Sequence, residues 1–205
     1  MIVIIDYGAG NVGSIKNMLK KVGFTSSISS DPSVIDKAEK LILPGVGSFA
    51  FGINQLNKLG LVQPLERKVK QQKTPILGIC LGVQLFTKAS EEGNAPGLGW
   101  FDAEVKWFNM IKELNHLRVP HMGWDEPKVV KESRLFRGME KDMRFYFVHS
   151  YYIKANDRSD VLTESFYGVT FTSALERENI IGVQFHPEKS HKFGMQLMKN
   201  FIELY

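Results

Sequence analysis

The chain has 205 residues and a net charge of +4; 43% of its residues are hydrophobic, 23% are charged, and one is a cysteine. A single cysteine excludes an internal disulfide, and the scattered Lys and Arg residues, mixed with acids, argue against a nucleic-acid partner. The N-terminal apolar run, about five residues long, is too short for a signal peptide or a membrane span, so we expect a cytoplasmic protein without membrane contact.

The first half of the chain alternates predicted strands and helices. Short apolar runs predict strands over residues 1–6, 24–30, 40–45 and 75–80. Apolar residues at helical spacing and helix-start signals, such as Asp31 before Pro32, predict helices over residues 11–23, 31–39, 61–73 and 81–90. This βαβα rhythm is typical of a parallel sheet covered by helices.

The second half is rich in predicted strands. These fall over residues 99–108, 142–153, 167–176 and 180–188, with a turn at 176–179, and a final helix covers 191–205. We therefore predict an α/β fold in one domain of residues 1–205. Its open, mostly parallel twisted sheet carries helices on both faces and gains antiparallel strands late in the chain.

A glycine-rich motif follows the first strand. Residues 8–13 read GAGNVG and match the G-x-G-x-x-G dinucleotide fingerprint, and Asp31 ends the second strand, where a ribose-binding acid would sit. The next units lack an obvious nicotinamide-side half. Dinucleotide binding stays open as an alternative function, against a tight turn that packs closely.

The cysteine lies in a nucleophile-elbow pattern. Cys80 stands between Gly78 and Gly82, at a junction of strand and helix. The helix N-terminus that follows favours a thiolate, and the backbone amide of Leu81 is placed to donate to an oxyanion. The alternative is a buried cysteine that serves only as a small apolar residue.

A thiolate nucleophile needs a proton carrier, and His186 is the best candidate. His186 and Glu188 are two positions apart in QFHPE, so on an extended chain their side chains point the same way. Glu188 could then fix the tautomer of His186, which would exchange protons with Cys80 and the leaving group. Ligand spacing near Cys80 is absent and there is no C-x-x-C, which excludes a metal site.

A second loop, residues 43–49 (LPGVGSF), ends the third strand at the edge where ligands bind in open α/β folds. Its glycines suit a backbone that approaches a reacting centre and supplies a second oxyanion donor. A plain turn that ends the strand is the alternative.

Six motifs in order, IDYGAGN, LPGVG, GICLGVQLF, VPHMGW, YFVHSY and QFHPEKS, resemble the class I (triad) glutamine amidotransferases, which have a flavodoxin-like fold. Within that family the chain is most similar to the glutaminase subunits of imidazole glycerol phosphate synthase. The resemblance implies hydrolysis of L-glutamine by Cys80, His186 and Glu188 through a thioester, without a cofactor. It also implies that Val46 is the second oxyanion donor after a peptide rearrangement. The glutamine pocket that it implies is formed by Gly45, Gly47, Gln84, His149, Ser150 and Tyr151.

The resemblance also implies a partner, a (β/α)₈-barrel cyclase that receives ammonia for histidine synthesis. The partner-facing residues would be Asn11, Trp124, Asp125 and Lys189. Asp125 departs from the family, which usually has Asn at this position. The aromatic stretch at 97–108 resembles paralogues that supply ammonia to a sugar amidotransferase in surface-polysaccharide synthesis, and this acceptor stays open.

Overall fold

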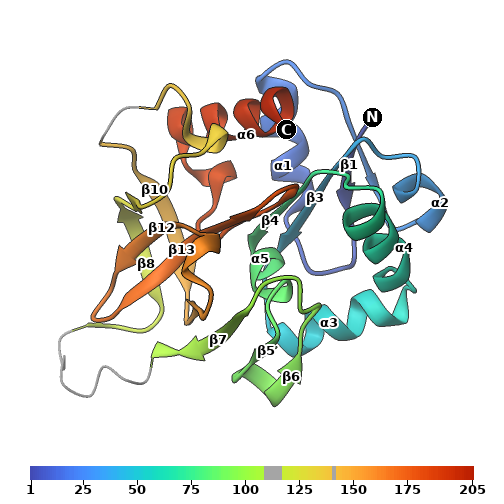
Figure 1. Cartoon of the computed structure of the whole chain (residues 1–205). Coiled ribbons are helices and arrows are strands. Elements are labelled where there is room, and N and C mark those ends of the chain that lie inside the picture. Colours follow the sequence, from blue (N-terminus) through green and yellow to red (C-terminus); the bar gives the residue numbers. More distant parts are fainter. Residues whose placement is uncertain (109–116, 140–141) are drawn as a thin grey trace.

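The computed structural model describes residues 1–108, 117–139 and 142–205 and contains one large sheet (Figure 1). In spatial order, its strands are β2 (Ser26–Ser29), β1 (Ile2–Ile5), β3 (Lys40–Gly45), β4 (Ile76–Cys80), β14 (Ile180–Val183), β13 (Thr170–Arg177), β11 (Tyr151–Ala155), β7 (Ala103–Trp107), β5 (Ala89–Ser90) and β6 (Ala95–Pro96). Strand β12 (Val161–Phe166) joins β13 to β9 (Lys128–Val129). Strands β8 (His121–Asp125) and β10 (Phe145–His149) form a separate antiparallel pair.

The sheet changes character where the second half of the chain enters it. Strands β2, β1, β3, β4 and β14 pair in parallel. From β14 onward, β13, β11 and β7 pair antiparallel. The predicted fold class is confirmed, including the late antiparallel strands. The pairing of β14 with β4 matters most, because it brings residues about a hundred positions apart to one edge of the sheet.

Helices cover both faces of the parallel strands. In β1, Ile2 and Ile4 face a core with buried residues of α1 (Val12–Lys21) and α6 (His191–Leu204). Val3 and Ile5 face the opposite core. The helices on that side are α2 (Pro32–Ile35), α3 (Phe49–Lys58), α4 (Val62–Glu66) and α5 (Leu81–Leu85). Each face therefore buries the alternate residues of a two-sided strand, as expected for a parallel sheet.

Several predicted helix lengths were wrong. The helix expected over 81–90 ends at Leu85, because the Thr87 hydroxyl donates to the Gln84 carbonyl at 2.8 Å and the chain turns into β5. The helix expected over 31–39 covers only 32–35, although Asp31 caps it as predicted. Over 61–73, α4 gives way to a π-helical turn, Arg67–Gln71. Helix α3, capped by Ser48, was not predicted.

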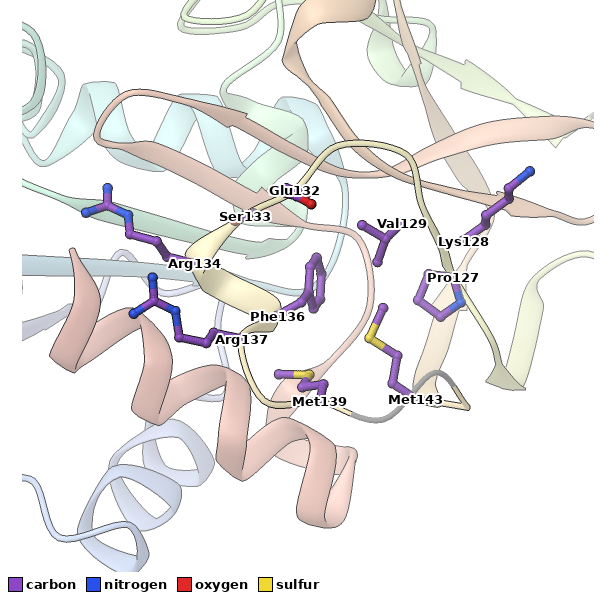
Figure 2. A pocket seen from close by; sticks show the side chains of 10 residues that line it. All are labelled: Pro127, Lys128, Val129, Glu132, Ser133, Arg134, Phe136, Arg137, Met139 and Met143. Carbon is purple, nitrogen blue, oxygen red and sulfur yellow. The ribbon is translucent and has the colours of Figure 1, made fainter.

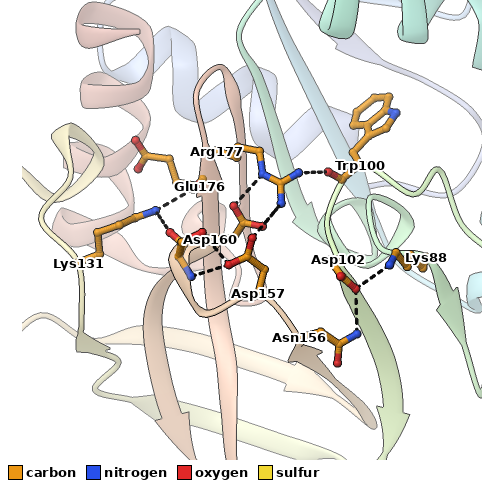
Figure 3. A network of polar contacts seen from close by, with 10 residues as sticks. Lys88, Trp100, Asp102, Lys131, Asn156, Asp157, Asp160, Glu176 and Arg177 are labelled. Carbon is orange, nitrogen blue, oxygen red and sulfur yellow. Dashed lines mark hydrogen bonds and ion pairs between the residues drawn. The ribbon is translucent and has the colours of Figure 1, made fainter.

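A polar network ties the β-rich half to its loops (Figure 3). Arg177 on β13 binds the carboxylate of Asp160 and donates to the Trp100 carbonyl at 3.2 Å. Asp102 accepts from Lys88 at 2.8 Å and from Asn156 at 2.9 Å. These contacts hold the loop before β7 against the turn after β11. Residues 1–108, 117–139 and 142–205 include no helix with the length and hydrophobicity of a membrane span.

Candidate active site

Cys80 occupies a strained bend at the carboxyl end of β4. Its backbone has φ 53° and ψ −110°, and α5 begins at the next residue. A side chain at Gly82 would collide with the carbonyl oxygen of Leu43, and one at Gly78 would lie 2.8 Å from the Val83 amide nitrogen. The expected elbow is present: Gly82 lets it pack against β3, and Gly78 lets the start of α5 lie close to β4. The Leu81 amide lies at the N-terminus of α5, directly after the sulfur-bearing residue.

His186 reaches the same place from β14. Val183 pairs with Ile79, so the chain leaves β14 beside the end of β4. The His186 amide donates to the Tyr146 carbonyl at 2.9 Å, and Ser190 donates to the His186 carbonyl at 2.6 Å. These two bonds fix the backbone of His186, whose side chain is almost fully buried.

Glu188 holds the imidazole of His186. The Nδ1 atom of His186 lies 2.7 Å from Oε1 of Glu188, and the side chains are only 2% and 4% exposed. Because a carboxylate only accepts, Nδ1 carries the proton. The buried Nε2 atom has no hydrogen-bond partner of standard geometry among the described residues, so it is the nitrogen free to exchange a proton.

The electrostatics of His186 favour a protonated ring. Burial lowers its pKa, but interaction with Cys80, and then with Glu188, outweighs this and raises the pKa to about 10. A proton on Nε2 is what an amide leaving group needs. This arrangement is what a cysteine nucleophile and a histidine acid would need.

A cavity of about 540 Å³ opens onto Cys80 and His186. Of the residues predicted from the sequence, it is lined by Val46, Gly47, Cys80, Leu81, Gln84, His149, Ser150, Tyr151 and His186. Gly45 does not line it, since this residue is packed against Tyr7 and Leu81, and Glu188 lies behind His186. The sequence reasoning missed Glu92, Trp107, Pro120 and Val148, which complete the wall. Glu92 lies in the short 3₁₀ turn that follows β5, and it belongs to none of the motifs found in the sequence.

The loop after β3, which was predicted to supply the second oxyanion donor, has its Val46 amide in a hydrogen bond within the protein. The Val46 amide donates to the Ala9 carbonyl at 2.7 Å, and Gly47 has φ +103°. Val46 as a residue is 46% exposed and lies on the cavity wall. The GAGNVG turn therefore has a structural role that its dinucleotide-like pattern did not predict. It holds the amide of the neighbouring loop.

Of the four residues predicted to face a partner, Trp124 and Lys189 lie near the start of α6. Trp124 is 46% exposed and stacks on His191, with ring centres 5.4 Å apart. The Lys189 ammonium lies 5.5 Å from the ring of Tyr146, the strand partner of Trp124. Asn11 caps α1, whose Ser14 shares a hollow with Lys189. Asp125 is half-buried beside His121.

A second hollow, of about 690 Å³, lies away from the elbow (Figure 2). Phe136, Met139 and Met143 line its apolar floor, and the guanidinium groups of Arg134 and Arg137 point away from it. It contains no nucleophile paired with a base. The smaller cavity at Cys80 is therefore the candidate active site.

Within the described part of the chain, no cluster of three or more His, Cys, Asp or Glu side chains could hold a metal ion.

The sequence matches the family model "Glutamine amidotransferase class-I" over residues 3–204. The chain belongs to the class-I glutamine amidotransferases. This amidotransferase is 54% identical, over 99% of both chains, to "Imidazole glycerol phosphate synthase subunit HisH 2" of Methanococcus maripaludis. It is 50% identical, over the full length of both chains, to the protein of the same name in Pseudomonas aeruginosa.

Solved structures agree on the fold of the amidotransferase. One described as "Crystal structure of glutamine amidotransferase" superposes with a TM-score of 0.76 at 19% identity, covering 100% of this chain and 98% of that one. "Structure of PurLQS from Thermotoga maritima" superposes with a TM-score of 0.74 at 16% identity, covering 98% and 96%. No comparison favours a dinucleotide-binding protein.

Proposed function

We propose that this amidotransferase is the glutaminase subunit of an imidazole glycerol phosphate synthase. It hydrolyses the side-chain amide of L-glutamine and passes the ammonia to a (β/α)₈-barrel cyclase subunit. One observation carries the chemistry: Cys80 and His186 open onto one cavity, with Glu188 2.7 Å behind the imidazole. The full-length similarity to subunits with that name carries the pathway.

The first half of the reaction forms a thioester. The Cys80 thiolate attacks the carboxamide carbon of glutamine, and the oxygen of that group takes up the negative charge. The Leu81 amide donates to this oxyanion, joined by the Val46 amide once that group leaves the Ala9 carbonyl. His186 gives its Nε2 proton to the nitrogen, the C–N bond breaks, and ammonia departs. Glu188 stabilises the imidazolium and fixes its ring.

The second half restores the enzyme. Neutral His186 takes a proton from water at Nε2, and the resulting hydroxide attacks the thioester carbonyl. The C–S bond breaks, the thiolate of Cys80 leaves, and glutamate is released. His186 is again protonated, which its pKa of about 10 favours at neutral pH. The side-chain carboxyl group of the product loses its proton to solvent, so glutamine and water give glutamate, ammonia and one proton, and no cofactor takes part.

The cavity wall offers groups for the rest of glutamine. Glu92 lies on the wall as a carboxylate and is held by the Phe49 amide at 2.7 Å, so it is placed to accept from the substrate's α-ammonium. Ser150, Tyr151 and Gln84 also line the cavity. We infer that these groups bind glutamine, together with Gly47 and His149.

Ammonia released into neutral water would be protonated and lost as a nucleophile, so a closed path to the partner is part of the proposal. The partner-facing surface is formed by Asn11, Trp124, Asp125 and Lys189, with Trp124 as an aromatic anchor.

We infer one functional domain over residues 1–205, because α1 and α6, from opposite ends of the chain, share one core. We place the enzyme in the cytoplasm, where its substrate is made and a lone thiol stays reduced.

The test is reconstitution with a barrel cyclase. Glutamine, the phosphoribulosyl imidazolecarboxamide nucleotide and both subunits should yield imidazole glycerol phosphate, glutamate and a carboxamide ribotide. Ammonium salt in place of glutamine is the control for an active cyclase. If glutamate forms but the imidazole product does not, while a sugar amidotransferase accepts the ammonia, the pathway assignment is wrong and the glutaminase assignment stands.

A further inference from the structure

Two buried amide side chains lie between strand β11 and the sulfur of Cys80. Gln84 on α5 is 5% exposed, and Gln184, just after β14, is fully buried. Nε2 of Gln84 lies 3.2 Å from the Tyr151 carbonyl oxygen and 3.0 Å from Oε1 of Gln184. Nε2 of Gln184 lies 3.7 Å from the sulfur of Cys80. The sequence reasoning assigned no role to Gln184.

The direction of these hydrogen bonds is fixed by chemistry. A backbone carbonyl only accepts, so the atom of Gln84 that faces Tyr151 must be the nitrogen. That nitrogen spends its second hydrogen on Gln184, which must therefore present its oxygen to Gln84. The remaining end of Gln184, its NH₂ group, then faces the sulfur. One carbonyl oxygen, that of Tyr151, thus orients both amides.

The same carbonyl oxygen is itself held in place. Nδ1 of His149 lies 2.7 Å from the Tyr151 oxygen and must donate to it. Nε2 of His149 then accepts from Nδ1 of His121, 3.1 Å away. The orientation of the two amides is therefore anchored to a second pair of buried side chains. Neither amide can flip without breaking at least two of these bonds.

From this arrangement we infer that Gln184 is a positioning residue for the nucleophile of the proposed glutaminase. Its N–H donates to the Cys80 sulfur, favours the thiolate over the thiol, and holds the sulfur in the position from which it faces His186. A hydrogen bond to the charged form of a group stabilises that form. This inference rests on the proposed function, because it assumes that Cys80 reacts as a thiolate.

The other neighbours of the sulfur make the role specific. The Val148 carbonyl, 4.0 Å away, can interact only with the protonated thiol, as an acceptor. The hydroxyl of Tyr7 is buried without a hydrogen-bond partner of its own among the described residues. His186, with Glu188 behind it, is the charged neighbour, and His149 forms another part of the cavity wall. Gln184 is thus an uncharged donor to the sulfur, in contrast to the charged His186.

The experiment measures how fast iodoacetamide alkylates the intact chain at a series of pH values. Cys80 is the only cysteine, so all alkylation reports on it. Gln184→Met and Gln184→Leu remove the donor and keep an apolar group of similar size. A hydrogen bond to a charged group is worth about one to two pH units, so we expect the midpoint of the alkylation profile to rise by about that much in both variants.

The matched control is Asn200→Leu. Asn200 on α6 is also a buried amide, but it donates to the Leu135 and Arg137 carbonyls, away from Cys80. The Asn200→Leu variant should have a lower melting temperature than the parent chain and the same midpoint of the alkylation profile. If both Gln184 variants unfold cooperatively and keep the parent midpoint, the inference is overturned. If the parent chain itself shows no reactive thiolate near neutral pH, the proposed function fails instead.

Discussion

The amide of Val46 donates a 2.7 Å hydrogen bond to the carbonyl of Ala9. This contact joins the loop after β3 to the turn before α1. While it is formed, the Val46 N–H is not available to donate to an oxyanion. Gly47, next in the chain, has a φ of +103°, a value that glycine adopts without strain. The peptide between Val46 and Gly47 can therefore rotate at little conformational cost. In the proposed mechanism, the Val46 amide can donate to the oxyanion only after this peptide moves.

We expect the isolated chain to hydrolyse glutamine slowly and the partner to accelerate it. Loss of one oxyanion donor costs roughly 10²–10³ in rate, so binding of a barrel cyclase should raise glutamate production by about that factor. The measurement is glutamate release with and without the cyclase at saturating glutamine. Full turnover by the chain alone would show that the Val46 amide is not needed.

The His186→Ala variant of the complex should lose a factor of roughly 10²–10⁴ in glutaminase rate, the usual contribution of general acid–base catalysis. Glu188→Gln should lose less, because an amide oxygen can still accept from Nδ1 and hold the ring. Steady-state rates at several glutamine concentrations separate kcat from KM. A loss below about tenfold for His186→Ala would mean that this imidazole does not carry the proton.

We expect alanine substitutions at two glycines, Gly82 and Gly13, to have different effects on stability. Gly82→Ala would drive a methyl group into the Leu43 carbonyl and should lower the free energy of unfolding by at least about 3 kcal/mol. Gly13→Ala, in α1, meets nothing within 4 Å and should be neutral or stabilising by up to about 1 kcal/mol. Urea unfolding of both variants compares them directly. Equal effects would mean that close packing of α5 on β3 does not define the bend.

Burial lowers the pKa of His149 to about 3, against the hydrogen bond to the Tyr151 carbonyl, which raises it. An unfolded histidine titrates near 6.5, so between these values the unfolded chain binds a proton that the folded chain does not. The free energy of unfolding should therefore fall as the pH drops below about 6.5, by about 2 kcal/mol from this group at pH 5. Burial also lowers the pKa of His121, which adds in the same direction.

The check is urea unfolding at pH 7 and pH 5 for the parent chain and for His149→Asn. The variant should be less stable at pH 7 but should lose less stability between the two pH values. The same pH dependence in both chains would show that His149 is not the group that resists protonation.

Local patterns in the sequence predicted the elements around Cys80 well, because each depends on neighbours along the chain. Gly78 and Gly82 define the bend by close packing, and Asp31 caps its helix with its own side chain. Helix α5 was predicted too long, because its end is set by a turn into β5 that apolar spacing does not reveal.

Contacts over long distances in the chain could not be predicted in the same way. The pairing of β14 with β4 joins residues about a hundred positions apart, and only motif order pointed to it. Gln184 and Glu92 were missed for this reason. Each acts through a partner that is distant in the sequence, Cys80 for one and the cavity wall for the other. The bond from Val46 to Ala9 likewise joins two glycine-rich motifs that were interpreted separately.

The proposed function depends on transfer of the glutamyl acyl group to the Cys80 sulfur and on use of the released ammonia by the partner subunit. The most direct test is product formation by the complex of a Cys80→Ala chain with the barrel cyclase, supplied in turn with glutamine and with ammonium salt. We expect the Cys80→Ala complex to lose synthesis from glutamine and to keep synthesis from ammonia at the parent rate. Synthesis from glutamine at an undiminished rate would contradict it.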